Sequence, residues 1–379
     1  MHYRRAMSSE APFEIFLAVP PGLEQALCDE ALEKGFAGPA PVPGGVVMRG
    51  GWPDVWRANL VLRGASRVLV RIGGFRALHL AQLDKRARRF PWADTLRPDV
   101  PLRVEAVCRA SRIYHAGAAA QRIETALREE FGVEISPDAA LRLMVRIEDD
   151  LCTFSLDTSG EPLHKRGHKQ AVNKAPLRET LAALFLRECG FDGTGPVLDP
   201  MCGSGTLVIE AAEMAAGLYP GRDRAFAFEQ LASFDPAAFA ALRARARPRD
   251  PGPRFFGRDR DTGAIAMSRA NAARAGVDGF SDFQPGAISD LRPPAEGPGL
   301  VIVNPPYGGR IGNRKLLFGL YGALGKVLAE RFAGWRVGVI TGAPELARAT
   351  GLPFLPTGAP VAHGGMRITL YRTAVLGRR

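Results

Sequence analysis

The stretch from Val197 to Glu210 constrains the fold of this chain more than any other. Its sequence, Val-Leu-Asp-Pro-Met-Cys-Gly-Ser-Gly-Thr-Leu-Val-Ile-Glu, is typical of the end of a buried strand, a glycine turn and the start of an apolar helix. In a parallel α/β sheet, such a unit directs a strand-end carboxylate, here Asp199, and the first helix amides into one crevice. The fingerprint G-x-G-x-x-G is matched only in part, because Val208 replaces the third glycine. The helix end favours an anion and Asp199 favours a cation or hydroxyl donors, so the unit predicts a ligand of mixed charge.

Residues 300–308, Leu-Val-Ile-Val-Asn-Pro-Pro-Tyr-Gly, form a second apolar run with a polar and aromatic end. Pro305 and Pro306 have no backbone N–H and a restricted φ, so the turn is stiff and its carbonyl oxygens stay available. The Asn304 amide, a free carbonyl and the Tyr307 ring are therefore expected together at the carboxyl edge of a sheet. These groups are the ones needed to hold a planar base by its exocyclic amino group.

Together the two stretches resemble the class I methyltransferases that methylate amino groups of nucleobases. A closer similarity, to the family that joins this domain to a THUMP RNA-binding domain, rests on Asp199-Pro200-Met201-Cys202-Gly203-Ser204-Gly205 with Ile209-Glu210. Within that family the chain looks most similar to the bacterial 23S ribosomal RNA guanine-2-amino methyltransferases, over about residues 13–375. The resemblance implies S-adenosyl-L-methionine as the cofactor, whose sulfonium, ammonium and carboxylate suit a site of mixed charge.

The resemblance also implies roles for individual residues. The implied cofactor site consists of Asp199, Pro200, Cys202, Gly203, Ser204, Gly205, Thr206, Asp259, Arg260, Ile288 and Asn304, and the implied catalytic group consists of Asn304, Pro305, Pro306 and Tyr307. Asp259 is expected to accept the ribose hydroxyls, and Asp261 to cap the next helix, unless both are ordinary loop acids. Ala287 stands where many relatives carry an acid beside the adenine, so either Asp290 or the Ile288 backbone is expected to contact that ring.

The base pocket implied by the resemblance needs neither a metal nor a strong base. The Asn304 carboxamide and the Pro305 carbonyl would accept both hydrogens of a guanine 2-amino group, which favours a pyramidal nitrogen with its lone pair directed at the methyl group. Tyr307 would stack on the base. Cys202 belongs to the cofactor turn and not to the base pocket, so we expect a packing residue and not a nucleophile.

The predicted fold is α/β. A ferredoxin-like domain over residues 12–75 and a THUMP domain over 76–162 form an α+β module. A class I (Rossmann-like) methyltransferase domain with a mostly parallel seven-stranded sheet follows over 163–379, including a basic linker at 163–174. The last two strands, near 353–357 and 366–373, have no helix between them and are expected to be antiparallel. Trp52 and Trp56 lie on one helical face and are expected in the core, and residues 236–247 are expected to form an exposed helix.

Basic residues outnumber acidic ones by 50 to 39 in the 379 residues, which gives a formal net charge of +11 and favours a polyanionic partner. We expect RNA, most plausibly 23S ribosomal RNA, although solvated basic faces are the plain alternative. The expected RNA contacts are Lys85, Arg86, Arg88, Arg89, Arg109, Arg112, Lys165, Arg166 and Lys169. Five scattered cysteines without C-x-x-C spacing indicate a reducing compartment, the cytoplasm, and no metal site. No membrane segment and no obligate protein partner are evident.

The predicted function is the S-adenosylmethionine-dependent methylation of a guanine 2-amino group in structured RNA. Three alternatives stay open: a transfer-RNA enzyme of the same architecture, a DNA adenine methyltransferase, and an RNA-binding assembly factor whose methyltransferase domain is inactive. Residues 76–162 argue against the DNA enzyme. The intact Asp199, Gly203, Gly205 and Asn304 argue against the inactive form. The target nucleotide and the oligomeric state are not encoded in any pattern of the sequence.

Overall fold

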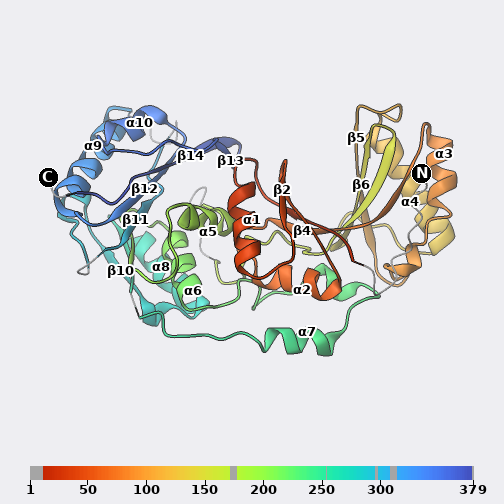
Figure 1. Cartoon of the computed structure of the whole chain (residues 1–379), viewed down its shortest axis with the longest axis horizontal. Helices are drawn as coiled ribbons and strands as arrows, with labels where there is room; N and C mark the ends of the chain where they lie inside the picture. The colour runs from red at the N-terminus through yellow and green to blue at the C-terminus, as the bar shows by residue number, and fades with distance from the viewer. Residues whose placement is uncertain (1–11, 171–176, 253, 295–297, 308–313, 378–379) are drawn as a thin grey trace. The chain divides into compact units, whose positions relative to one another are not determined.

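The computed structural model describes residues 12–170, 177–252, 254–294, 298–307 and 314–377. The chain forms two compact units, each assembled from segments that are distant in sequence. Among the described residues, the first unit contains 12–19, Cys28–Leu163 and Arg224–Arg245. The second contains Pro20–Leu27 and the described parts of His164–Asp223 and Ala246–Arg379. Each unit has one seven-stranded sheet (Figure 1).

The sheet of the first unit has the strand order β2-β3-β1-β4-β7-β6-β5. Its strands are β1 (Phe13–Ala18), β2 (Ala40–Val42), β3 (Gly45–Gly50), β4 (Arg67–Arg76), β5 (Leu102–Arg109), β6 (Leu141–Glu148) and β7 (Leu151–Asp157). All neighbouring strands are antiparallel except β5 and β6. Strand β4 pairs with β1 on one side and with β7 on the other, and it runs through the predicted domain boundary at residue 75. That boundary, and the THUMP assignment of 76–162, stay predictions.

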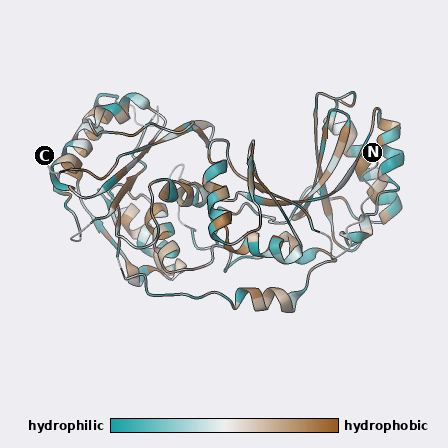
Figure 2. Ribbon diagram, in the orientation of Figure 1, coloured by the Kyte–Doolittle hydropathy of each residue, from teal (hydrophilic) through white to brown (hydrophobic). Residues whose placement is uncertain are grey.

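Alternating burial explains why the helices of the first unit cover the sheet. Leu143, Val145 and Ile147 of β6 are buried, whereas the residues between them are not, as a strand with one covered face requires. Figure 1 shows α3 and α4 beside β5 and β6, and Figure 2 shows apolar residues along the strands. The helices of this unit are α2 (Trp52–Val61), α3 (Leu80–Ala87), α4 (Ala116–Ala126) with a π-helical extension Leu127–Phe131, α7 (Pro236–Arg243) and most of α1 (Glu24–Glu33).

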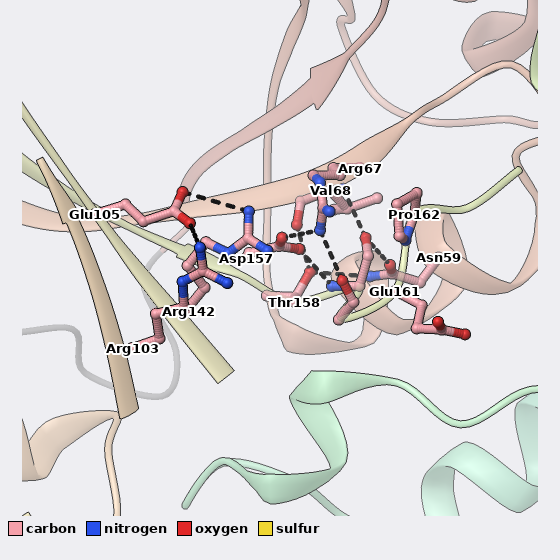
Figure 3. A network of polar contacts seen from close by, with 12 residues as sticks. Asn59, Arg67, Val68, Arg103, Glu105, Arg142, Asp157, Thr158, Glu161 and Pro162 are labelled. Carbon is pink, nitrogen blue, oxygen red and sulfur yellow. Dashed lines mark hydrogen bonds and ion pairs between the residues drawn. The ribbon is translucent and has the colours of Figure 1, made fainter. Parts of the chain in front are cut away.

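A buried polar network holds the end of β7 (Figure 3). Asp157 forms an ion pair with Arg67 and accepts the backbone N–H of Ser159 at 3.0 Å. Its burial raises the pKa of the Asp157 carboxyl, while the Arg67 guanidinium opposes that rise. The Thr158 hydroxyl donates to the Val68 carbonyl at 2.7 Å. The network fastens the chain to β4 just before it leaves the first unit.

Residues 224–245, which follow the first strand of the second unit in sequence, belong to the first unit. Phe239 of α7 is buried, and its ring centre lies 6.5 Å from that of Trp56. Phe228 and Phe234 also contact Trp56, at 6.4 and 5.8 Å between ring centres. The expected core position of Trp56 is therefore confirmed. The helix expected at 236–247 is present and mostly exposed, but it ends earlier, at Arg243, and it buries Phe239 in an aromatic cluster.

The sheet of the second unit has the order β10-β9-β8-β11-β12-β14-β13. Its strands are β8 (Val197–Asp199), β9 (Phe255–Asp259), β10 (Ser281–Pro285), β11 (Leu300–Val303), β12 (Arg336–Thr341), β13 (Val361–His363) and β14 (Met366–Arg372). The first five are parallel and β14 is antiparallel to both neighbours, which confirms the predicted fold class. The strand expected at 353–357 is absent, because its two prolines donate no ladder hydrogen bond. Phe354 makes only an isolated bridge, and β13 takes its place.

Strand order places a crevice at the centre of this sheet. The chain leaves β8 for β9 and β10 on one side and later returns to β11 and β12 on the other, so the carboxyl ends of β8 and β11 meet at the switch point where α/β sheets bind ligands. The helices around it are α5 (Glu179–Glu188), α6 (Thr206–Ala215), α8 (Thr262–Ala275), α9 (Arg314–Arg331) and α10 (Pro344–Ala349). Within the described residues, no helix combines the length and apolarity that a membrane crossing needs.

Candidate active site

The turn after β8 has a backbone that only glycine adopts without strain. Gly203 and Gly205 have φ values of 54° and 85°, in the left-handed region. A Cβ on Gly205 would also lie 3.1 Å from Ser268 of α8. The Ser268 hydroxyl donates to the Gly203 carbonyl at 2.8 Å, and the Asn271 amide donates to the Ser204 carbonyl at 3.0 Å. Helix α8 therefore holds the turn in the shape that directs the first amides of α6 into the crevice.

Asp199 is a buried carboxylic acid at the end of β8. Its side chain accepts the backbone N–H of Met201 at 3.0 Å, and its residue is only 3% exposed. Burial raises the pKa of the Asp199 carboxyl to about 8, and the nearby Asp259 carboxylate adds to that rise. A buried acid of this kind is stabilised in its ionised form by a cationic ligand group.

Asp259 lies at the end of the adjacent strand β9 and contacts the same turn. One carboxylate oxygen accepts the Gly203 N–H at 3.0 Å, and the other accepts the Asp261 N–H at 3.0 Å. Each oxygen keeps a lone pair for a further donor such as a hydroxyl. Asp261 accepts the Gly263 N–H at 2.8 Å and caps α8, as predicted. Arg260, between these two acids, is exposed.

The two candidates for the adenine contact, Ile288 and Asp290, differ in burial. Ile288 is partly buried and packs, together with Met201 and Tyr307, against the core of the second unit. Asp290, the acid considered as an alternative adenine contact, is exposed, and its carboxylate lies 3.3 Å from the Ser289 hydroxyl. Burial raises the pKa of the Cys202 thiol far above its usual range, so Cys202 is a poor nucleophile.

Asn304 follows β11 directly, at the edge where β8 ends. Strand β11 pairs with β8 in parallel register, with Leu300 opposite Val197 and Val301 opposite Leu198. The Asn304 side-chain oxygen is buried, and no described residue donates a hydrogen bond to it. A buried acceptor without a donor is rare in folded proteins and calls for an explanation. A ligand amino group in the crevice would supply the missing hydrogen.

The turn that carries Asn304 is held from behind by a residue that the sequence did not reveal. The buried Tyr321 hydroxyl of α9 lies 3.1 Å from the Thr341 hydroxyl and 3.4 Å from the Pro306 carbonyl oxygen. Burial raises the pKa of Tyr321 to about 12, so the hydroxyl stays protonated. A Cβ on Gly342 would lie 3.4 Å from the Tyr307 ring, which shows how closely that ring passes the end of β12. No short-range pattern links Tyr321 to Pro306, so only the fold could show it.

The basic linker does not have the exposure that an RNA contact requires. Arg166 is 2% exposed and forms a 3.1 Å ion pair with Glu210 of α6. Lys169 forms a 2.9 Å ion pair with Glu179 and donates to the Thr206 hydroxyl at 2.8 Å. The prediction of RNA contacts is therefore wrong for Arg166 and Lys169, because both cations form ion pairs with glutamates inside the second unit. Lys165 alone of the three is exposed.

The predicted RNA contacts of the first unit also divide into two kinds. Arg88 forms ion pairs with Asp84, Glu129 and Glu130 at 2.7 to 3.0 Å, so its charge is compensated locally. Arg86 is half-buried, whereas exposed side chains are present at Lys85, Arg89, Arg109 and Arg112. In the described part of the chain, no group of three or more His, Cys, Asp or Glu could hold a metal ion.

The sheet order, the glycine turn and the strand-end residues define the second unit as a class I methyltransferase domain. Residues 166–353 match the family described as an RMKL-like methyltransferase domain, and residues 14–69 match an RlmL ferredoxin-like domain. The second unit therefore carries an RMKL-like methyltransferase domain, and that domain family depends on S-adenosylmethionine.

Two curated relatives are described as ribosomal RNA large subunit methyltransferase K/L. The one from Syntrophotalea carbinolica is 37% identical over 363 residues, which cover 90% of this chain and 51% of the relative. The one from Allochromatium vinosum is 38% identical over 361 residues, which cover 89% and 48%. The chain thus spans about half the length of these relatives. A crystal structure of a predicted N6-adenine-specific DNA methylase from Listeria monocytogenes has a TM-score of 0.85 and 28% identity, covering 95% of this chain and 96% of that one.

Proposed function

We propose that this chain methylates the exocyclic 2-amino group of a guanine in 23S ribosomal RNA, with S-adenosylmethionine as the methyl donor. The observation that carries the proposal is the buried side-chain oxygen of Asn304 at the switch point of the sheet, which accepts no hydrogen bond from any residue that the structure describes. Because an amide oxygen accepts hydrogens and donates none, it matches an amino group. The names of the curated relatives support ribosomal RNA as the substrate.

The residues around the glycine turn fit the donor. Asp199 would face a cationic group, the first amides of α6 would face a carboxylate, and Asp259 has lone pairs left for ribose hydroxyls. S-adenosylmethionine supplies an electrophilic methyl group when it is bound there. Because burial raises the pKa of the Asp199 carboxyl to about 8, this carboxyl is mostly protonated at neutral pH until a cationic ligand group lowers its pKa.

The residues after β11 would prepare the amino group for attack. A guanine amino nitrogen is a poor nucleophile, because its lone pair is delocalised into the ring. Asn304 and the Pro305 carbonyl would accept its two hydrogens and favour a pyramidal nitrogen. Tyr307 would hold the base by stacking, and Tyr321 would keep the Pro306 end of the turn in position. Positioning of this kind lowers the barrier by up to about 7–11 kcal/mol.

The first unit would bind the RNA through exposed cations. Lys85, Arg89, Arg109 and Arg112 are exposed and remain candidates for phosphate contacts, and Lys165 of the second unit is a further exposed candidate. A guanine in a duplex would have to be turned out of the stack to reach the site. We place this reaction in the cytoplasm, where ribosomal RNA is processed in bacteria.

Product analysis tests the proposal. The purified chain is incubated with methyl-labelled S-adenosylmethionine and, in separate reactions, protein-free 23S ribosomal RNA, bulk transfer RNA and duplex DNA, each from a strain lacking the enzyme. We expect label only in 23S RNA, recovered as N2-methylguanosine. Label confined to transfer RNA would show that the proposed substrate is wrong, while the proposed mechanism would stand. Label in DNA as N6-methyladenine would favour the activity ascribed to the Listeria protein, and no label in any arm would favour an inactive domain.

Cofactor binding is expected to release protons near neutral pH. The pKa of the Asp199 carboxyl is about 8 in the free protein, so most of it is protonated at pH 7, and a cationic ligand lowers that pKa. Calorimetry with S-adenosylmethionine, in the absence of RNA and in buffers of different ionisation enthalpy, should show release approaching about one proton at pH 7, declining above pH 8. Asp199→Asn should abolish the release. Equal proton release by both proteins would show that Asp199 does not face the cation.

The same shift has a consequence for stability. A carboxyl whose folded pKa is raised binds more protons in the folded than in the unfolded state between about pH 4 and 8. The free energy of unfolding should therefore fall as pH rises through that window, and Asp199→Asn should flatten this part of the profile.

A further inference from the structure

Tyr114 is the most exposed of the large apolar side chains that the structure describes, at 84%. It lies between the end of β5 and the start of α4 in the first unit. A single exposed apolar side chain is ordinary on a protein surface, so its exposure alone does not indicate a partner. The ordinary explanation is a mobile surface loop, but the geometry of this loop is different.

Hydrogen bonds hold the loop against the hairpin between β6 and β7. The Ser111 hydroxyl donates to the Arg109 carbonyl at 2.8 Å and accepts the Asp150 N–H at 3.0 Å. The Arg112 N–H donates to the Asp150 carboxylate at 2.8 Å. Ile113, which directly precedes Tyr114, is buried and anchors the loop in the core. The loop is thus built to present its outward side chains in a defined position.

The backbone of this region adopts unusual conformations. Ala110 has a φ of 46°, and Asp149 and Asp150 of the facing hairpin have φ values of 49° and 59°. Asp149 and Asp150 are the two central residues of the β6–β7 hairpin turn, which commonly requires positive φ at both positions, so Ala110 alone of the three has a conformation that is rare for its residue type. The hydrogen bonds and the Ala110 conformation therefore give this loop a defined shape.

The loop that carries the exposed ring also carries two exposed arginines, Arg109 and Arg112. The Arg112 side chain is 71% exposed, and Arg109 is also exposed. The Asp150 carboxylate is occupied by the Arg112 N–H and lies 3.9 Å from the Arg112 guanidinium, whereas Asp149 is an exposed acid at the hairpin tip. An exposed aromatic ring in a loop that also carries exposed arginines matches a base and a neighbouring phosphate.

From this geometry we infer that Tyr114 stacks on an unpaired nucleobase of the RNA, while Arg112 contacts a neighbouring phosphate. The inference deepens the proposed function, because it rests on RNA as the substrate of this chain. It adds a second nucleobase contact, outside the crevice that would hold the methylated guanine. It also commits the loop 109–115 to single-stranded RNA rather than to a regular duplex, in which base faces are covered.

The test uses the full chain without cofactor and two fluorescent probes of equal length, a ten-nucleotide oligouridylate and an abasic ribose-phosphate strand. Wild type should prefer the oligouridylate, and Tyr114→Ala should weaken oligouridylate binding by roughly 5- to 150-fold and leave the abasic strand unaffected. Tyr114→Phe should retain most of the preference. Arg112→Gln should weaken both probes and reduce the salt slope by about 0.7. Phe318→Ala, at a partly exposed aromatic of α9, is the matched control and should bind like wild type.

Two results would overturn the inference: equal affinity of wild type for the two probes, or unchanged oligouridylate binding by Tyr114→Ala. Thermal unfolding of each variant shows whether the fold is intact, and a folded Tyr114→Trp variant, whose emission should be quenched by stacked bases, gives a second measurement. Because no cofactor is present, the outcome is independent of methyl transfer. Base-dependent binding with no methylated product would retain the stacking contact and reject the proposed function.

Discussion

Replacing Asn304 with Ala should reduce kcat for methyl transfer by a factor on the order of 10²–10³, the loss that follows removal of one preorganised hydrogen-bonding group from an active site. The side-chain oxygen of Asn304 is buried and has no donor among the described residues, so it is ready to accept a substrate hydrogen. Its removal would leave the Pro305 carbonyl as the sole acceptor. Single-turnover transfer from labelled S-adenosylmethionine to 23S RNA measures the effect.

The affinity for S-adenosylhomocysteine separates this role from a cofactor contact. For Asn304→Ala we expect that affinity to stay within a few fold of wild type, because the interaction strengthens in the transition state. Asn304→Asp keeps an acceptor of the same size and should lose less activity than Asn304→Ala. A collapse of cofactor affinity with a normal rate at saturation would instead assign Asn304 to cofactor binding.

Replacing Arg166 with Met should lower the free energy of unfolding by about 3–5 kcal/mol, because the change removes the cation with which Glu210 forms a buried ion pair. Both side chains of this pair are only 1% exposed, and their atoms lie 3.1 Å apart. Chemical denaturation measures the change. Arg166→Met combined with Glu210→Leu should recover most of the loss, since both charges of the buried pair are then removed together.

Lys165→Met is the matched control for the linker. The Lys165 side chain is exposed, so this substitution should change the free energy of unfolding by less than about 0.5 kcal/mol. The free energies of unfolding of Arg166→Met and Lys165→Met should therefore differ sharply, although the two substituted residues are adjacent in sequence. A stable Arg166→Met protein with weakened RNA binding would contradict the buried ion pair and restore Arg166 as an RNA contact.

The parts of the site that depend on local pattern could be predicted from the sequence. Asp199 and Asn304 both follow apolar runs, and the strand-end positions follow from that pattern because parallel strands end at one edge. The left-handed turn was evident from Gly203 and Gly205. Asp261 could be predicted as a cap from its place just before a helix.

The parts that depend on distant partners could not be predicted. Arg166 and Glu210 are 44 residues apart in sequence, and a basic run has the same composition whether its side chains meet phosphates or buried carboxylates. Tyr321 reaches Pro306 only because α9 packs beneath the turn. Strand β13 forms in place of the strand expected near residue 355, because the prolines of that segment cannot donate hydrogen bonds to a neighbouring strand. A count of apolar residues does not reveal this effect.

The aromatic cluster around Trp56 has a consequence for the order of events during synthesis. Phe228, Phe234 and Phe239 are translated only after β8 and α6 of the second unit. Domains of a growing chain usually fold in order from the N-terminus. Here the first unit lacks part of its core until about residue 245 has left the ribosome, when much of the second unit is already made. A nascent chain that stops before Phe228 should therefore expose Trp56, and chaperone binding is expected to be strongest in that interval.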